Sequence, residues 1–273
     1  MKKILLSALY FTLGFASQAQ QRIVSLNGTI SEMLCALGLE KQIVGVDITS
    51  NYPEGLKNKP KLGHNMNISA EGVLALQPTI VVGIEGQVKS QLKEQLQGAG
   101  IKTVLLKQDY SITGTRQLLQ DVAATVGKTG KATALLQVYD KQIAGLKVKP
   151  VNKKVLFIYA RGAGSIMVSG TGTSLDKIIQ LAGAKNAVNG FKDFKPYSSE
   201  ALVAENPDVI LLFNSGLQSV GDIEGLLKIP GIAQTTAGKK KQVISMDGEM
   251  LSGFGLRLPQ AIQTLNNKIL AFN

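Results

Sequence analysis

The sequence predicts an α/β fold of two similar lobes with mainly parallel sheets, joined by one long helix, with a ligand cleft between the lobes. Three observations support this prediction. Short apolar runs alternate with helical patterns in both halves, a 14-residue segment occurs twice, and a long proline-free helical stretch separates the halves. Alternation of strands with helices indicates parallel sheets that are covered by helices on both faces.

The first nineteen residues have the pattern of a secretory signal. Lys2 and Lys3 precede a mostly apolar stretch over residues 4–15, and Ser17-Gln18-Ala19 supplies the small residues typical of a cleavage site. The apolar stretch is too short to span a membrane. We therefore expect residues 1–19 to be a cleavable signal peptide and the mature protein to be periplasmic.

Seven short runs rich in Val, Ile and Leu are predicted to be buried strands. Four belong to the N-terminal lobe, at residues 23–26, 43–46, 79–82 and 103–106. Three belong to the C-terminal lobe, at residues 155–159, 209–212 and 243–245.

The repeated segment is Ser69–Val82, which aligns without a gap on Ser198–Leu211. Each copy begins with a serine that is suited to cap a short helix, followed by a glutamate, a proline stop and a strand. The two glutamates are Glu71 and Glu200. Helices are also expected to start at Gly28-Thr29 and at Gly172-Thr173. These parallels indicate internal duplication.

The predicted connecting helix covers residues 128–147, where Leu135, Val138, Tyr139, Ile143 and Leu146 recur at helical spacing. It separates an N-terminal lobe over residues 20–127 from a C-terminal lobe over residues 148–273. A single helical connector predicts lobes that rock by small angles only.

Composition argues against several classes of function. The formal net charge is +11, but the lysines are scattered, and the only dense run, Lys239–Lys241, is expected to be a solvated turn. The chain has no Trp and no alternation of aromatic and basic residues, so nucleic-acid binding is not expected. Cys35 is the only cysteine, which excludes an intramolecular disulfide, and we expect it in the core. No Gly-x-Ser-x-Gly motif or cluster of metal ligands points to an enzyme.

His64 is the only histidine of the chain. One imidazole cannot form a two-histidine metal site, but it can be the single protein ligand of haem, which brings its own equatorial ligands. A loop histidine without a role, or one that hydrogen-bonds another ligand, is the alternative.

The motifs of the chain resemble those of the periplasmic haem-binding proteins of ABC importers. In the N-terminal half the resemblance lies in residues 47–53, Gly63-His64 and Ser69–Leu74. In the C-terminal half it lies in residues 167–170, 172–173, 181–187, 198–202 and 253–257. The resemblance implies that the chain captures haem and delivers it to an importer, with a permease dimer and its ATPase as partners. We expect the protein itself to be a monomer.

This family usually has a tyrosine, whose phenolate binds the iron, where this chain has His64, and commonly an arginine where it has Met66. The two departures fit together. A tyrosine needs a neighbouring cation to lower its pKa and favour the phenolate, whereas an imidazole binds iron in its neutral form and needs no such cation. His64 is therefore expected to be the axial ligand of the haem iron. Met66 and Met167 are candidates for the second axial position.

Other candidate residues follow from the same resemblance. Arg161, Lys195 and Arg257 are candidates to pair with the haem propionates, Tyr159 and Tyr197 to hydrogen-bond or stack, and Tyr52 to contact the porphyrin. Glu71 and Glu200 are expected to dock on arginines of the two permease subunits, although helix capping alone also explains an early glutamate. A corrinoid or a ferric siderophore is the alternative ligand, and an exported enzyme is a further alternative.

Overall fold

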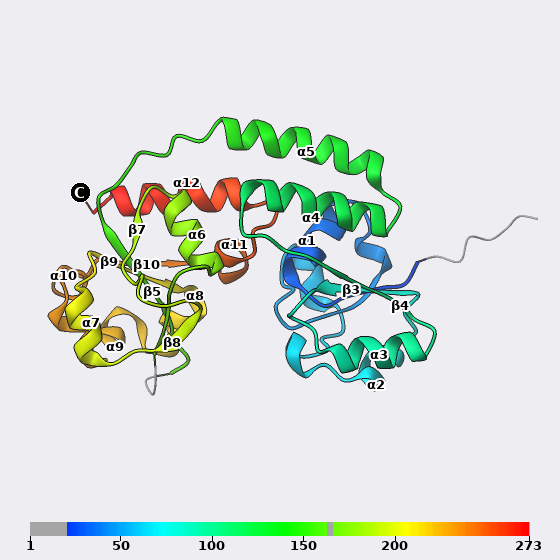
Figure 1. The fold of residues 1–273 in the computed structure, drawn as a ribbon, viewed down its shortest axis with the longest axis horizontal. Helices are drawn as coiled ribbons and strands as arrows, with labels where there is room; N and C mark the ends of the chain where they lie inside the picture. The colour runs from blue at the N-terminus through cyan, green and yellow to red at the C-terminus, as the bar shows by residue number, and fades with distance from the viewer. Residues whose placement is uncertain (1–20, 163–165, 273) are drawn as a thin grey trace, which may run out of the picture.

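The computed structural model describes residues 21–162 and 166–272 of the chain. The predicted signal peptide, residues 1–19, lies outside the described residues. Two lobes lie side by side and are bridged along one side by a long helix (Figure 1). No described helix is long and apolar enough to cross a membrane. The predicted α/β fold of two lobes is confirmed.

The N-terminal sheet is entirely parallel. Its strand order is β2 (Ile43–Val46), β1 (Ile23–Ser25), β3 (Ile80–Ile84) and β4 (Lys102–Leu106). Ile23 pairs with Ile43 on one side and with Ile80 on the other. All four strands were predicted from the sequence.

The C-terminal sheet combines a parallel and an antiparallel part. Its order is β10 (Val243–Met246), β9 (Val209–Phe213), β5 (Lys154–Tyr159), β6 (Met167–Ser169) and β8 (Phe194–Pro196), and β7 (Lys185–Asn186) also pairs with β5. The β5–β6 and β6–β8 pairs are antiparallel. The sequence prediction missed β6, β7 and β8, because two or three residues are too few to show a period.

Helices cover both faces of each sheet, and alternate strand residues enter different cores. In β1, Ile23 belongs to one buried cluster and Val24 to another. In β5, Phe157 and Ile158 are divided in the same way. The helices of the N-terminal lobe are α1 (Gly28–Ala36), α2 (Ala70–Leu74), α3 (Ser90–Gly98) and α4 (Ile112–Thr125), with the 3-10 turns η1 (Glu40–Gln42), η2 (Glu54–Asn58) and η3 (Asn65–Asn67).

The C-terminal lobe has more and shorter helices. They are α6 (Ser174–Leu181), α7 (Ser199–Glu205), α8 (Asn214–Ser219), α9 (Asp222–Leu227), α10 (Thr236–Lys239), α11 (Gly248–Ser252) and α12 (Leu258–Leu270), with the 3-10 turn η4 (Ile232–Gln234). Helix α10 ends in the lysine run, whose three side chains are exposed as expected.

Helix α5 (Thr129–Ala144) joins the lobes. Its 16 residues correspond to about 24 Å of helix, somewhat shorter than the predicted span because Gly145 already forms the C-cap. Ala132 and Leu136 pack in the N-terminal core, whereas Tyr139 packs in the C-terminal core. The helix is therefore anchored in both lobes.

The predicted duplication is visible in the backbone. Ser69 Oγ accepts a hydrogen bond from the Gly72 amide at 3.1 Å, and Ser198 Oγ accepts one from the Ala201 amide at 3.2 Å. After each short helix a non-glycine residue adopts a left-handed conformation directly before the proline. These residues are Gln77, with a φ of 46°, and Asn206, with a φ of 43°.

Candidate ligand-binding cleft

A cleft of about 910 Å³ lies between the lobes. Its lining comes from the carboxyl ends of all seven parallel strands that were predicted from the sequence. Asn27–Thr29 follow β1, Thr49 follows β2, Gln87 follows β3, Tyr110 follows β4, Arg161 follows β5, Asn214 follows β9, and Asp247–Glu249 follow β10. Ligands of α/β proteins bind at this end of the sheet, and the volume lies in the range of small-molecule sites.

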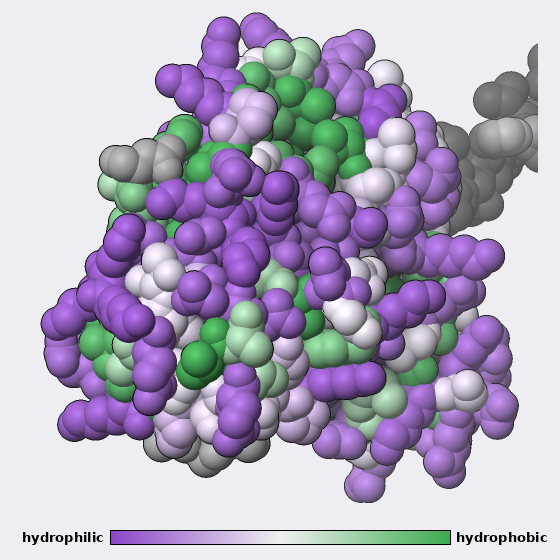
Figure 2. Space-filling model, turned by 60° about the vertical axis from the view of Figure 1, so that its left-hand side comes forward, coloured by the Kyte–Doolittle hydropathy of each residue, from purple (hydrophilic) through white to green (hydrophobic). Residues whose placement is uncertain are grey.

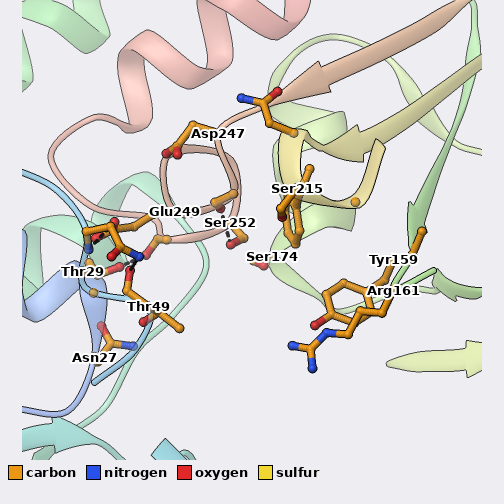
Figure 3. A pocket seen from close by; sticks show the side chains of 18 of the residues that line it. Asn27, Thr29, Thr49, Tyr159, Arg161, Ser174, Ser215, Asp247, Glu249 and Ser252 are labelled. Carbon is orange, nitrogen blue, oxygen red and sulfur yellow. Dashed lines mark hydrogen bonds between the residues drawn. The ribbon is translucent and has the colours of Figure 1, made fainter. Parts of the chain in front are cut away.

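The two walls of the cleft differ chemically. Tyr159 and Arg161 lie on one side, and Asn27, Thr29 and Thr49 lie on the other (Figure 3). Amides and hydroxyls dominate the lining as a whole, and Arg161 is the only cation among the described residues that form it. Figure 2 shows that hydrophilic residues also dominate the outer surface of the molecule in that view, with hydrophobic residues in smaller groups.

His64 lies on a segment that extends the edge of the N-terminal sheet. The Leu62 amide donates to the Val46 carbonyl at 2.9 Å, and the Ile48 amide donates to the Gly63 carbonyl at 2.9 Å. The segment therefore runs along the carboxyl end of β2, next to the loop that carries Thr49 and Asn51 into the cleft. Gly63 has a φ of 97°, a left-handed conformation that favours glycine, immediately before His64.

The imidazole of His64 is exposed, and it does not line the cleft itself. Its Nδ1 accepts a hydrogen bond from the Met66 amide at 3.4 Å. Binding of iron at Nε2 requires the ring proton to be on Nδ1, which would break this contact. The contact is long, so its loss is a small penalty.

Met66 lies in the same 3-10 turn as His64 and is 40% exposed. Two residues of one short turn cannot reach opposite faces of a planar ligand. The structure therefore disfavours Met66 as the second axial ligand, and leaves it as an apolar contact beside His64.

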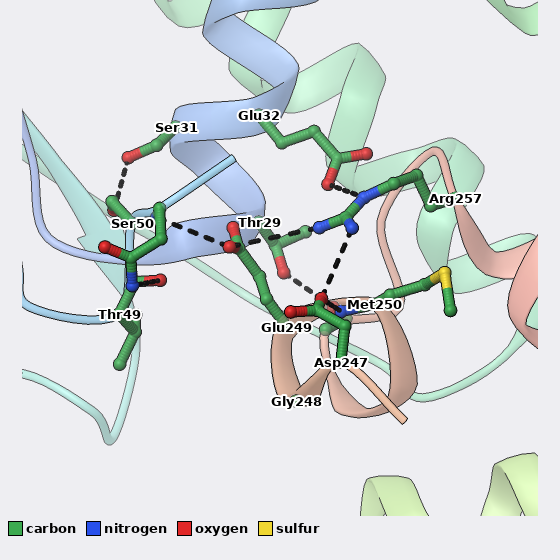
Figure 4. A network of polar contacts seen from close by, with 12 residues as sticks. Thr29, Ser31, Glu32, Thr49, Ser50, Asp247, Gly248, Glu249, Met250 and Arg257 are labelled. Carbon is green, nitrogen blue, oxygen red and sulfur yellow. Dashed lines mark hydrogen bonds and ion pairs between the residues drawn. The ribbon is translucent and has the colours of Figure 1, made fainter. Parts of the chain in front are cut away.

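Arg257 does not line the cleft, contrary to expectation for a propionate partner. Its Nε lies 2.8 Å from Glu32 Oε2, its Nη1 lies 3.3 Å from Asp247 Oδ1, and the side chain is only 14% exposed (Figure 4). The guanidinium joins carboxylates of the two lobes.

Tyr52 is also placed outside the cleft. The Arg257 Cζ lies 3.8 Å from the centre of its ring, and both residues line a second cavity of about 370 Å³. The structure does not bring Tyr52 together with Arg161 at the cleft.

Tyr159 ends β5 and Arg161 lies two positions later, and the Arg161 Cζ lies 5.2 Å from the centre of the Tyr159 ring. Both line the cleft, as expected from the sequence. The backbone of Met167 pairs directly with that of Tyr159 across β5 and β6, but Met167 itself does not line the cleft.

Lys195 and Tyr197 lie on and just after β8, and neither lines the cleft. Lys195 Nζ lies 5.0 Å from the centre of the Phe191 ring. The Tyr197 hydroxyl donates to Glu205 Oε1 at 2.9 Å, and burial together with this bond raises the pKa of Tyr197 to about 12. Tyr197 is thus engaged within its own lobe.

Glu71 and Glu200 are exposed in the first turns of α2 and α7. Hydrogen bonds from its own backbone amide and from Ser198 hold the pKa of Glu200 below its usual value. Helices α2 and α7 lie on the side of the lobes away from α5 (Figure 1). Each lobe therefore presents one carboxylate of the repeated segment on this side.

Sequence reasoning missed Glu249 and the neutral polar lining. Single amides and hydroxyls carry no motif, and only their positions just after predicted strands would have indicated them. No group of three or more His, Cys, Asp or Glu among the described residues is arranged to hold a metal ion.

The family described as "Periplasmic binding protein" matches residues 23–250 of the chain. The chain belongs to the periplasmic binding protein family. The resemblance expected from the sequence is thereby confirmed, and the chain is a substrate-binding protein of the kind that serves ABC importers outside the cytoplasm.

Solved structures of this family are similar over nearly the whole chain. The periplasmic heme-binding protein RhuT from Roseiflexus sp. RS-1 is 36% identical, with a TM-score of 0.88, and covers 93% of this chain and 99% of that chain. The periplasmic heme-binding protein BhuT, solved with two hemes, is 33% identical, with a TM-score of 0.86, and covers 92% and 98%.

Curated relatives within the family are more distant. The uncharacterized ABC transporter substrate-binding lipoprotein YvrC of Bacillus subtilis (strain 168) is 26% identical, over 91% of this chain and 80% of that protein. The vitamin B12-binding protein of Vibrio campbellii (strain ATCC BAA-1116) is 24% identical, over 76% of each chain.

Proposed function

We propose that the protein captures haem in the periplasm and delivers it to an ABC-type inner-membrane importer, with His64 as the protein ligand of the iron. The observation that carries this proposal is the position of the only histidine at the carboxyl end of the N-terminal sheet, beside the loop that lines the cleft. The similarity to haem-binding proteins of 33–36% identity supports the same ligand.

Tyr159 is the candidate for the second axial ligand on the opposite lobe. A phenolate is a known ligand of haem iron. Arg161 lies next to the Tyr159 ring and lines the same wall. Met66 is disfavoured by its placement in the same turn as His64, whereas Met167 remains a candidate next to Tyr159. Arg161 is proposed to pair with a propionate.

Glu71 and Glu200 are proposed to contact the permease. Two equivalent carboxylates on a duplicated body suit a partner with two-fold symmetry. Both side chains are exposed, so neither is needed for the core. Residues 1–19 are proposed to be the cleavable signal that exports the chain. The binding role does not require catalysis, and we propose none.

A corrinoid is the second candidate ligand, and one observation favours it. Amides and hydroxyls of Asn27, Asn51, Gln87, Gln108 and Asn214, among others, line the cleft, and such groups suit a ligand that carries many amides. Vitamin B12-binding proteins are among the relatives at 22–26% identity.

One titration separates these candidates. The purified mature protein is mixed with hemin, cyanocobalamin or a ferric catecholate, and binding is followed by absorption and by calorimetry. Haem binding predicts a Soret band of a ligated haem and saturation with hemin only. Saturation with cyanocobalamin, without a change in the hemin spectrum, would reverse the assignment.

A further inference from the structure

The part of the cleft next to the lobe junction contains the start of helix α1. The nine residues of α1 begin at Gly28, and Asn27 caps the helix by accepting a hydrogen bond from the Ile30 amide at 3.1 Å. The amides of Gly28 and Thr29 have no acceptor within the helix, because the first turn never does. Asn27, Gly28 and Thr29 all line the cleft.

Glu249 of the other lobe points at this helix start. Its side chain is only 10% exposed, and its Oε1 has no hydrogen-bond partner among the described residues. A Cβ atom added to Gly28 would lie 2.6 Å from Glu249 Oε1, which places the carboxyl directly against the first residue of α1. Its Oε2 accepts a hydrogen bond from the Asn51 amide at 3.4 Å.

The surroundings of Glu249 favour its neutral form. Burial is the main cause that raises the pKa of Glu249 to about 8, and Glu32 and Asp247 raise it further. Arg257 opposes this, but its Nε lies 2.8 Å from Glu32, whereas its Nη2 is 3.9 Å from Glu249, too far for a hydrogen bond. The other titratable groups that interact electrostatically with Glu249 are Lys61 and Cys35.

Oε1 of this buried carboxyl has no hydrogen-bond partner among the described residues, and in the protonated form of Glu249 the carboxyl is a hydrogen-bond donor at the wall of the cleft. We propose that Glu249 and the first turn of α1 bind a carboxylate of the ligand, which for haem is a propionate. Protonated Glu249 donates a hydrogen bond to the ligand carboxylate and keeps its proton, and the amides of Gly28 and Thr29 stabilise the negative charge of the ligand. No covalent bond changes. This inference rests on the proposed haem function.

The arrangement also orients the ligand. The proposed arrangement places the polar edge of the porphyrin at the first turn of α1, and a face of the ring towards the His64 segment. Two exposed apolar side chains flank that segment: Ile48, whose amide bonds Gly63 and which is 54% exposed, and Met66. An amphipathic ligand would match both ends of such a cleft.

The test compares hemin with hemin dimethyl ester, whose propionates cannot be ionised, between pH 6 and pH 9.5. For the native protein, hemin affinity should fall by about tenfold as the pH rises from 7 to 9, because the donor proton of Glu249 is lost. Affinity for the ester should be independent of this titration. The ester has the same iron chemistry, so it controls for hydroxide binding at the metal.

The variant Glu249→Gln keeps a donor of the same shape and cannot ionise. It should bind hemin without the fall above pH 7, and more tightly than the native protein at pH 9. Glu54→Gln, which alters a carboxylate with 88% of its side chain exposed, should follow the native profile.

The inference is overturned if hemin and its ester give the same pH profile with the native protein, a comparison that does not depend on any variant folding. It is also overturned if Glu249→Gln retains the fall. Failure of the native protein to bind hemin at any pH would instead remove the proposed function on which the inference depends.

Discussion

In the N-terminal lobe, α2 is followed by a left-handed Gln77 before Pro78, and in the C-terminal lobe α7 is followed by a left-handed Asn206 before Pro207. In each lobe, a basic residue next to the start of the first strand binds backbone carbonyls at the end of this short helix or just after it. Arg22 donates to the Leu76 and Gln77 carbonyls at 2.7 and 2.9 Å, and Lys154 donates to the Glu205 carbonyl. The two lobes thus repeat one unit down to its side-chain contacts.

The cleft walls of the two lobes are not repeated. Both walls carry amides and hydroxyls, but the C-terminal wall adds the cation Arg161 together with Tyr159 and Phe213, whereas the N-terminal wall has His64 beside it. The sheet of the C-terminal lobe also has the antiparallel strands β6 and β8, which have no counterpart in the N-terminal lobe. In the proposed function, the shared surface meets a symmetric partner and the divergent surface an asymmetric ligand.

The largest effect is expected from the unequal cleft walls. His64→Ala should weaken hemin binding by at least about 100-fold, which is about 2.8 kcal/mol, because it removes the iron ligand of the N-terminal lobe. Tyr159→Phe should change the spectrum as well if both lobes supply a ligand. Absorption spectra and titrations measure both. An unchanged spectrum of His64→Ala would show that the lone histidine is not the ligand.

Glu249 allows a test of how the lobes meet, because this C-terminal carboxyl is buried against the N-terminal helix α1. Its pKa is raised to about 8 in the fold, so its favourable contribution is complete below the unfolded value near 4.5 and is lost as the pH rises through 8. Relative to Glu249→Gln, the native protein should lose about 2 kcal/mol of unfolding free energy between pH 6.5 and pH 9. Urea denaturation at several pH values measures this, and parallel curves would contradict it.

The repeated surface predicts equal effects in the two lobes. Glu71→Ala and Glu200→Ala should each reduce delivery to the reconstituted importer by about tenfold, about 1.4 kcal/mol, and neither should change hemin affinity. Stimulated ATP hydrolysis in liposomes is the measurement. A large effect of one substitution with none of the other would mean that the partner does not use the duplication.

The smallest expected effect concerns the caps. Ser69→Ala and Ser198→Ala each remove a hydrogen bond to the first turn of a short helix, and each should lower the unfolding free energy by about 1 kcal/mol. Thermal and urea denaturation measure whether the two variants lose the same unfolding free energy. Ser90→Ala is a suitable control, since Ser90 lies at the first position of α3 and provides no cap.

Much of the fold could be predicted from the sequence. The strand and helix periods predicted the seven longer parallel strands, the repeat and the connecting helix, because these elements bury apolar residues at regular spacing. Strands β6 and β8 escaped because three residues show no pattern. Among the site residues, the prediction for Arg161 agrees with its place in the cleft. The ion pair of Arg257 could not be predicted, because the residues around it in the sequence do not indicate that Glu32, 225 positions away, is its partner.

The anchoring of α5 in both cores has a consequence for the kinetics of capture. Ala132 and Leu136 are buried in the N-terminal core and Tyr139 in the C-terminal core. Opening the cleft widely would therefore pull some of these side chains out of their cores. The binding site is thus largely preorganised, and little conformational entropy is lost when a ligand enters. We expect the association rate to depend on diffusion and solvent viscosity, with release controlled by the iron ligand bond.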